Sequence, residues 1–185
     1  QALKLDPDQT STYRKRGRLF QELKNFDASI SDLTKAIELE PNDYRSYWSR
    51  SYAKRKAKDL KGAVDDLTKA IEINPNDARC FFERGSLKYD LKEYRDALLD
   101  INSAIEINPN DAFYYKFRIE IKIHFNDFQG IINDATMAIG FNPNDSGYYR
   151  VRGEAKRYLG DIKGFCADIK VASSLGDEIA KEILT

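Results

Sequence analysis

The sequence predicts an all-α protein built as a stack of repeated two-helix units, and three observations support this prediction. The five prolines, which are all the prolines in the chain, recur at one constant spacing, at Pro7, Pro41, Pro75, Pro109 and Pro143. The last four each begin the phrase Pro-Asn-Asp. Between these phrases, apolar residues recur mostly at three- and four-residue steps, as on one side of a helix. A fixed period of about 34 residues is typical of stacked supersecondary units.

Each repeat is expected to hold two helices, because the Pro-Asn-Asp phrase ends one helix and starts another. Proline cannot continue the helix before it, and the Asn and Asp oxygens can accept hydrogen bonds from the first N–H groups of the next helix. After Pro75, for example, Phe81 and Leu87 give the first helix an inner face, and Ile101 and Ile105 do so for the second. A polar turn at residues 92–93 separates the two helices.

The period also predicts the boundaries of the repeats. Residues 1–9 are expected to end a truncated upstream repeat. Five repeats follow at 10–43, 44–77, 78–111, 112–145 and 146–176, the fifth being divergent. Asp177 stands where a sixth proline is due, and residues 177–185 are expected to form a short amphipathic capping helix. The chain begins at Gln1 and its single methionine is Met137, so we expect a processed form or an excised piece.

Aligning the repeats places like residues in columns. One column is aromatic, one is small except for Ile119, and one is alanine throughout. In that order they are Tyr13, Tyr47, Phe81, Tyr115 and Tyr149; Gly17, Ser51, Gly85, Ile119 and Gly153; and Ala36, Ala70, Ala104, Ala138 and Ala172. With the period and the prolines, these columns resemble the tetratricopeptide repeat from about Thr10 to Ile179. The resemblance implies a right-handed α-solenoid whose inner groove, lined by the first helix of each repeat, receives a peptide or a partner helix.

Two further columns are charged and never vary. They are Arg16, Arg50, Arg84, Arg118 and Arg152, and Asp32, Asp66, Asp100, Asp134 and Asp168. Five arginines matched by five aspartates indicate a structural ladder of ion pairs rather than a ligand site. Each arginine could pair with the aspartate of its own repeat or with that of the preceding repeat, as Arg50 could with Asp66 or Asp32. The sequence leaves both pairings open.

The resemblance places candidate binding residues on the first helices. The expected peptide-binding groove comprises Arg14, Arg18, Arg45, Trp48, Tyr52, Arg55, Arg79, Phe82, Tyr89, Phe113 and Phe117. The face is basic near the N-terminus and aromatic in the middle, and Trp, Tyr and Arg dominate interface energetics. We therefore expect a protein or peptide partner with acidic groups and apolar side chains. The terminal-carboxylate clamp of some chaperone-associated relatives is not expected, because its asparagines are absent and Glu83 replaces a base.

Composition argues against other function classes. The chain has 30 basic and 30 acidic residues, whereas proteins devoted to the phosphate backbone usually carry a marked positive excess. A nucleic-acid binder using Arg14, Arg18, Arg45 and Arg55, with Trp48 and Tyr52 for stacking, is the alternative. Self-association through the truncated N-terminal end is another.

Chemistry-bearing residues are sparse. His124 is the only histidine, and the cysteines Cys80 and Cys166 lie far apart in the sequence. Catalytic pairs that need two of these residues and zinc sites of the usual spacing are therefore not expected. We expect a non-enzymatic protein without metal or cofactor. No apolar run approaches the ~18 residues of a membrane span.

Overall fold

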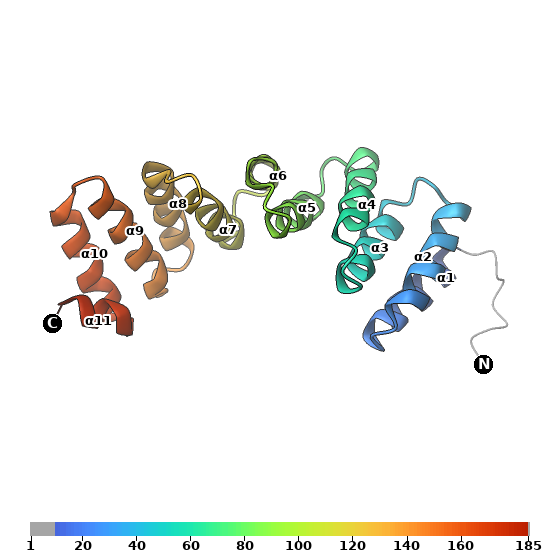
Figure 1. The fold of residues 1–185 in the computed structure, drawn as a ribbon, viewed down its shortest axis with the longest axis horizontal. Coiled ribbons are helices and arrows are strands. Elements are labelled where there is room, and N and C mark those ends of the chain that lie inside the picture. Colours follow the sequence, from blue (N-terminus) through green and yellow to red (C-terminus); the bar gives the residue numbers. More distant parts are fainter. Residues whose placement is uncertain (1–9, 185) are drawn as a thin grey trace. The chain divides into compact units, whose positions relative to one another are not determined.

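A computed structural model describes residues 10–184, and every regular element in that range is an α-helix (Figure 1). The helices are α1 (Thr10–Glu22), α2 (Phe26–Leu39), α3 (Tyr44–Lys56), α4 (Leu60–Ile73), α5 (Ala78–Asp90), α6 (Tyr94–Ile107), α7 (Ala112–Ile123), α8 (Phe128–Phe141), α9 (Ser146–Tyr158), α10 (Ile162–Ser174) and α11 (Glu178–Leu184). The prediction of an all-α repeat fold is confirmed. The stretch 1–9, predicted to end an upstream repeat, lies outside the described residues. None of the helices in the described range is long and apolar enough to cross a membrane.

The aspartate of each Pro-Asn-Asp phrase caps the helix that follows. The side chains of Asp43, Asp77, Asp111 and Asp145 each accept a hydrogen bond from a backbone N–H in the first turn, that of Arg45 in the case of Asp43. Such a cap contributes about 1 kcal/mol to helix stability, because it satisfies a donor that has no partner within the helix. Because each phrase places an N-cap, the helices α3, α5, α7 and α9 begin at the same spacing as the prolines.

The turn inside each helix pair has the same backbone shape. One residue in each of these turns has a positive φ: 57° at Lys24, 66° at Lys58, 65° at Lys92, 54° at Asn126 and 84° at Gly160. These positions recur with the same period as the prolines. The left-handed conformation is easy for glycine and unfavourable for lysine, so the first three turns hold a mildly strained residue.

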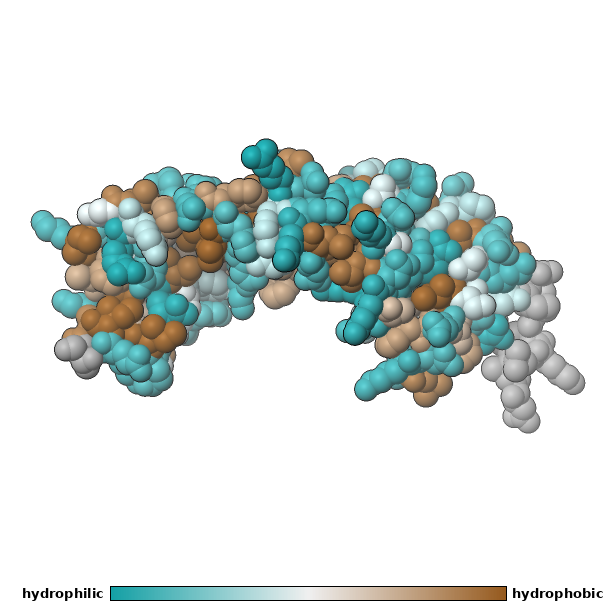
Figure 2. All heavy atoms as spheres, in the orientation of Figure 1, coloured by the Kyte–Doolittle hydropathy of each residue, from teal (hydrophilic) through white to brown (hydrophobic). Residues whose placement is uncertain are grey.

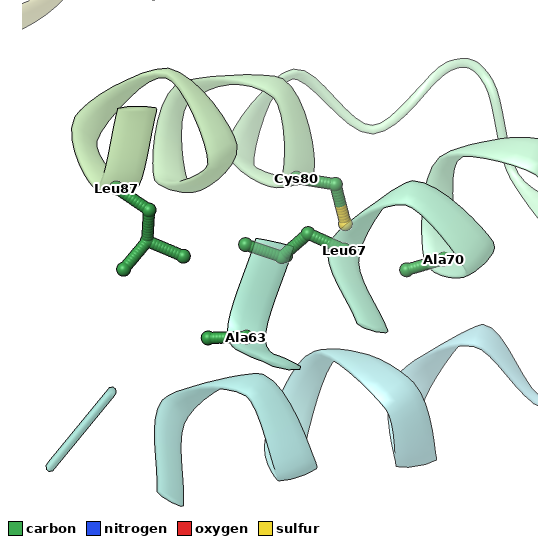
Figure 3. Packing of buried hydrophobic residues seen from close by; sticks show 5 residues of the cluster. All are labelled: Ala63, Leu67, Ala70, Cys80 and Leu87. Carbon is green, nitrogen blue, oxygen red and sulfur yellow. The ribbon is translucent and has the colours of Figure 1, made fainter. Parts of the chain in front are cut away.

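The described residues divide into two compact units, one up to residue 100 and one from residue 101, with the boundary inside α6. In the first unit, helices pack on their neighbours in chain order, α1 on α2, α2 on α3, α3 on α4 and α4 on α5. Figure 3 shows one core cluster, in which Ala63, Leu67 and Ala70 of α4 lie against Cys80 and Leu87 of α5. All five are at most 1% exposed, and the small residues on α4 allow close helix approach.

In the second unit, α7 packs on α8, α8 on α9, α9 on α10 and α10 on α11. Ile119, which breaks the column of small residues, packs with Ile131 and Ala135 in one core cluster. The alanine at 135 stands where the other repeats have Leu33, Leu67, Ile101 and Ile169. Large and small side chains have therefore exchanged places while one core is still filled, as cores tolerate when the total volume is kept.

The last helix, α11, packs on α10 through Ala180, which is fully buried with Ile169 and Ala172. The Asp177 side chain accepts a hydrogen bond of 2.9 Å from the Ala180 backbone N–H. Ile179, Ile183 and Leu184 of α11 are exposed, and Figure 2 shows apolar side chains gathered near this helix.

Candidate functional site

The arginine and aspartate columns form bidentate ion pairs within each helix pair. Arg50 donates from Nε and Nη2 to Asp66 at 2.9 and 2.7 Å, and Arg84 donates to Asp100 at 2.9 and 2.6 Å. Arg16, Arg118 and Arg152 bind Asp32, Asp134 and Asp168 in the same way. Of the two pairings left open by the sequence, the structure therefore has the one within a single repeat.

A second cation reaches the same aspartates in four of the five helix pairs. The Nζ atoms of Lys54, Lys88, Lys122 and Lys156 lie 2.8 to 3.0 Å from the carboxylate oxygens. The matching position of the first pair holds Phe20. Burial alone would raise the pKa of Asp168, but the hydrogen bonds and charges of Arg152 and Lys156 outweigh it and hold the pKa below its ordinary value. Sequence reasoning missed this lysine column, although it follows the same period as the prolines.

The ladder arginines also join consecutive helix pairs. Their remaining Nη1 groups donate to Thr34, Thr68, Asn102 and Thr136 of the preceding pair, at 2.9, 3.2, 2.8 and 3.2 Å. The threonines donate in turn to backbone carbonyls of Ile30, Val64 and Ile132. Each guanidinium of the ladder also lies 5.3 to 5.8 Å from the aromatic ring of its own repeat's aromatic column. In Arg50, Arg84, Arg118 and Arg152, all three guanidinium nitrogens therefore donate hydrogen bonds within the protein.

The first helices of the first unit carry two pockets that share Trp48 and Arg18. Each has a volume of about 240 Å³. Gln21, Glu22 and Tyr52 complete one pocket, and Arg14, Tyr44, Arg45, Ser49, Asp77 and Arg79 complete the other. The structure thus brings together six of the residues predicted for the groove, from α1, α3 and α5: Arg14, Arg18, Arg45, Trp48, Tyr52 and Arg79.

Three of the predicted groove arginines already have carboxylate partners. Arg14 bonds to Asp43, Arg79 bonds to Asp77 at 2.9 Å while lying 5.8 Å from the Trp48 ring, and Arg55 reaches Glu83 and Asp90 at 3.3 Å. The hydrogen bond from Arg79 holds the pKa of Asp77 below its ordinary value against the effect of burial. The face is therefore less positive than the sequence suggests.

Arg18 and Arg45 differ from these three. Arg18 is exposed and Arg45 is exposed as well, and neither forms an ion pair with any residue between 10 and 184. Arg45 lies 5.0 Å from the ring of Tyr44, which keeps its guanidinium beside the second pocket. These two side chains are the cationic groups of this face that remain for an incoming anion.

The aromatic residues predicted further along the groove are not part of the Trp48 pockets. Phe82 and Tyr89 on α5 are half-buried, and they do not line either pocket. Phe113, 53% exposed, and the half-buried Phe117 lie on α7 in the second unit. The Trp48 pockets are thus confined to the first unit.

The first helices of the second unit carry two pockets of a different character. One, of about 240 Å³, is lined mainly by apolar residues, among them Ile123, Phe128, Ile131, Val151 and Tyr158. The other, of about 300 Å³, shares Ile123 and Val151 with it and adds Lys116, Glu120 and Arg150. None of the residues predicted for the groove lines either of these pockets, so sequence reasoning missed both of them. Across the described range, His, Cys, Asp and Glu side chains form no cluster of three or more suited to a metal ion.

Tandem helix pairs that each contain the same ion pair define a helical-repeat solenoid protein. The sequence profile of the tetratricopeptide repeat matches residues 11–43 and 44–77, and the same columns continue through the later helix pairs. Residues 11–77 are therefore tetratricopeptide repeats.

Solved structures support this fold. A crystal structure of MamA protein covers 93% of the chain and 94% of its own length with a TM-score of 0.83 at 19% identity. YrrB, described as a TPR protein with an unusual peptide-binding site, covers 97% and 93% with a TM-score of 0.83 at 16% identity. The first TPR of Spaghetti (RPAP3), bound to an HSP90 peptide, covers 65% and 95% with a TM-score of 0.62 at 19% identity. No curated protein matches the sequence.

Proposed function

We propose that this protein is a non-enzymatic interaction scaffold that binds a partner protein or peptide on the first helices of its repeats. In the first unit, the partner segment is acidic and carries apolar side chains. Its carboxylate lies between Arg18 and Arg45, and an apolar neighbour packs on Trp48. Two solved structures of the same fold are described as having a peptide-binding site or a bound peptide, which supports the general role.

The observation that carries the proposal is the pair of unpaired guanidinium groups beside a half-buried tryptophan. A guanidinium without a carboxylate partner can form charge-assisted hydrogen bonds with an incoming carboxylate, about twice as strong as neutral ones. Trp48 offers an apolar face on the same pocket wall, and tryptophan and arginine are enriched among residues that dominate binding energy. Because Asp43 and Asp77 are close by, a singly charged carboxylate is favoured over a doubly charged phosphate.

The test uses the emission of Trp48, which is the only tryptophan in the chain. The whole protein is titrated with blocked eight-residue peptides of alternating Glu and Leu, of alternating Lys and Leu, and of alternating phosphoserine and Leu. We expect the Glu-Leu peptide to change the emission and to bind more tightly than the other two. The double variant Arg18→Ala/Arg45→Ala should weaken binding at least tenfold, because charge-assisted hydrogen bonds are lost.

The matched control is Arg95→Ala, which removes an exposed arginine of α6 that does not line the Trp48 pockets. Its binding should equal that of the unchanged protein. Equal binding of the Glu-Leu and Lys-Leu peptides, or equal loss in Arg95→Ala, would overturn the acidic-segment proposal.

Nucleic acid is the alternative ligand of the same residues, and salt distinguishes the two. Binding to a single-stranded RNA oligonucleotide would fall steeply with ionic strength because counterions are released. Two of the four arginines that this alternative requires, Arg14 and Arg55, are already paired with carboxylates. We expect no RNA binding at 150 mM salt, roughly the physiological ionic strength, and RNA that displaces the Glu-Leu peptide there would contradict the proposal.

A further inference from the structure

A comparison of equivalent positions within the chain points to a second binding site. In the first unit, Arg55 at the end of α3 bridges to Glu83, Ser86 and Asp90 on α5, at 3.2 to 3.3 Å. These polar contacts close the junction between two consecutive first helices. The equivalent positions two repeats further along the chain are Ile123, Val151, Glu154 and Tyr158.

In the second unit, these four residues line an open pocket. Ile123 is 51% exposed and Tyr158 65% exposed, and both line the pocket of about 240 Å³ with Val151 and Glu154. The buried side chain of Ile131 also lines it. Where the first unit has a salt-bridged junction, the second has an apolar pocket, which we call the Ile123 socket. Covering exposed apolar surface of this kind is favourable, because apolar area is removed from water.

One wall of the Ile123 socket is fixed in advance. The ring of Tyr158 stacks on that of Phe128, with centroids 4.5 Å apart and planes 7° apart. Arg157 lies 5.7 Å from the Tyr158 ring and 5.4 Å from the Phe165 ring, and it bonds to Glu154 at 2.6 Å. A preorganised wall lowers the entropic cost of binding.

The volume of the Ile123 socket, about 240 Å³, is below the ~300–1,000 Å³ of typical small-molecule sites, so one large side chain fits better than a cofactor.

The charge beside the socket selects the occupant. Glu120 lies one turn before Ile123 on α7 and lines the adjoining pocket that shares Ile123. It is exposed, and no other residue in the described range forms an ion pair with it. Arg157 and Arg150, the nearby bases, are held by Glu154 and Asp177, whereas Lys116 is two turns from Ile123, about 10 Å along the helix. The unpaired charge nearest the socket is therefore negative.

We propose that the Ile123 socket binds one leucine-sized or aromatic side chain of a partner peptide in which a basic residue, placed to reach Glu120, adjoins the apolar one. This site goes beyond the acidic segment proposed for the Trp48 pockets, and its ligand has the opposite charge.

The experiment records methyl NMR spectra of the whole protein during titration with three blocked peptides, Ala-Lys-Leu-Lys-Ala, Ala-Lys-Ala-Lys-Ala and Ala-Glu-Leu-Glu-Ala. We expect the first to shift the methyl signals of Ile123 and Val151. Replacing its leucine with alanine should weaken binding at least tenfold, because several buried methyl and methylene groups are lost. Replacing Lys with Glu should weaken it severalfold. No shift at these methyls, or equal binding of the leucine and alanine peptides, would overturn the proposal.

Two variants test the socket. Ile123→Arg/Val151→Glu rebuilds the Arg55–Glu83 pair in the second unit, where it should close the socket and abolish binding. Glu120→Gln removes the proposed partner of the peptide's lysine and should weaken binding of the Lys-Leu-Lys peptide severalfold. Circular dichroism confirms that each variant is folded. If the first variant unfolds, the peptide series and the second variant still decide the proposal.

The proposals for the two sites can be tested independently. Arg18→Ala/Arg45→Ala should leave peptide binding at the Ile123 socket unchanged, and Ile123→Arg/Val151→Glu should leave the Trp48 response to the Glu-Leu peptide unchanged. Loss of both responses in either variant would contradict the assignment of two sites.

Discussion

Arg84 on α5 donates two parallel hydrogen bonds to Asp100 on α6, and Nζ of Lys88 lies 2.8 Å from Oδ2, the oxygen that also accepts from Nε of Arg84. The Asp100 side chain is only 5% exposed. A buried carboxylate is stable as an ion only when it is well paired, and here two cations and fixed geometry meet that requirement. The same arrangement recurs along the chain, so its contribution to stability can be measured at one position and compared at others.

The first prediction concerns the loss of this pair. Asp100→Ala leaves two cations without their shared partner, and we expect a loss of about 3–5 kcal/mol in the free energy of unfolding. Chemical denaturation measures it. The control is Lys69→Ala, which removes an exposed pair with Glu72 and should cost less than about 1 kcal/mol. Equal effects in the two variants would show that the ladder is solvated.

The second prediction is a loss of stability in acid. The pKa of Asp168 is held below its ordinary value in the folded protein, so its ionised form favours folding above about pH 3.9, the unfolded pKa. This contribution disappears as the pH falls through the lower, folded pKa. Asp168→Asn should be less stable at neutral pH and should lose less stability between pH 5 and 2, roughly the range where carboxylates protonate. Asp65→Asn, at an exposed position, should follow the unchanged protein.

The third prediction uses the strained turns. Lys58 has a φ of 66°, which glycine adopts without the steric cost that a side chain brings. Lys58→Gly should raise the free energy of unfolding by about 0.5–1 kcal/mol. Lys69→Gly, inside α4, should lower it by about 1 kcal/mol. Thermal denaturation compares the two, and a destabilising Lys58→Gly would refute the strain argument.

The fourth prediction contrasts two glycines. A Cβ at Gly17 would lie 2.8 Å from Cγ of Leu33, which is fully buried, so Gly17→Ala should destabilise by about 1–3 kcal/mol through overpacking. A Cβ at Gly140 would meet nothing within 4 Å, and Gly140→Ala should stabilise α8 by up to about 1 kcal/mol. Melting temperatures should move in opposite directions.

The fifth prediction concerns the two free thiols. Burial raises the pKa of Cys80 to about 12, while Cys166 is exposed. A thiol reagent at pH 8, near the ordinary thiol pKa of ~8.5, should label Cys166 quickly and Cys80 only after unfolding, because the thiolate is the reactive form. Mass spectrometry of labelled peptides distinguishes the two. Rapid native labelling of Cys80 would show that its core opens frequently.

Much of the fold could be predicted because several aligned residue positions, among them the prolines, the aromatic residues and the alanines, recur with the same period. The partner choice of Arg50 could not, since Asp66 and Asp32 both lie at spacings that fit packed helix pairs. The positive φ angles of Lys24, Lys58 and Lys92 could not be predicted, because lysine is not a usual residue in the left-handed conformation. The charge of the Trp48 face was overestimated, because a sequence shows Arg14 and Arg79 but not the carboxylates that they contact. The Ile123 socket could not be predicted, because it is recognised only by comparison with the equivalent junction of the first unit, which Arg55 closes.

The bond from each ladder arginine to the preceding helix pair bears on how such arrays can be rebuilt. Arg50, Arg84 and Arg152 each need a hydroxyl at the matching position on the second helix of the preceding pair, and Arg118 uses the amide of Asn102 instead. A helix pair moved to another place in the chain would keep its own ion pair but would meet a new acceptor upstream. A helix pair moved to another array should therefore fit only where the preceding pair offers a hydrogen-bond acceptor to its arginine at this position.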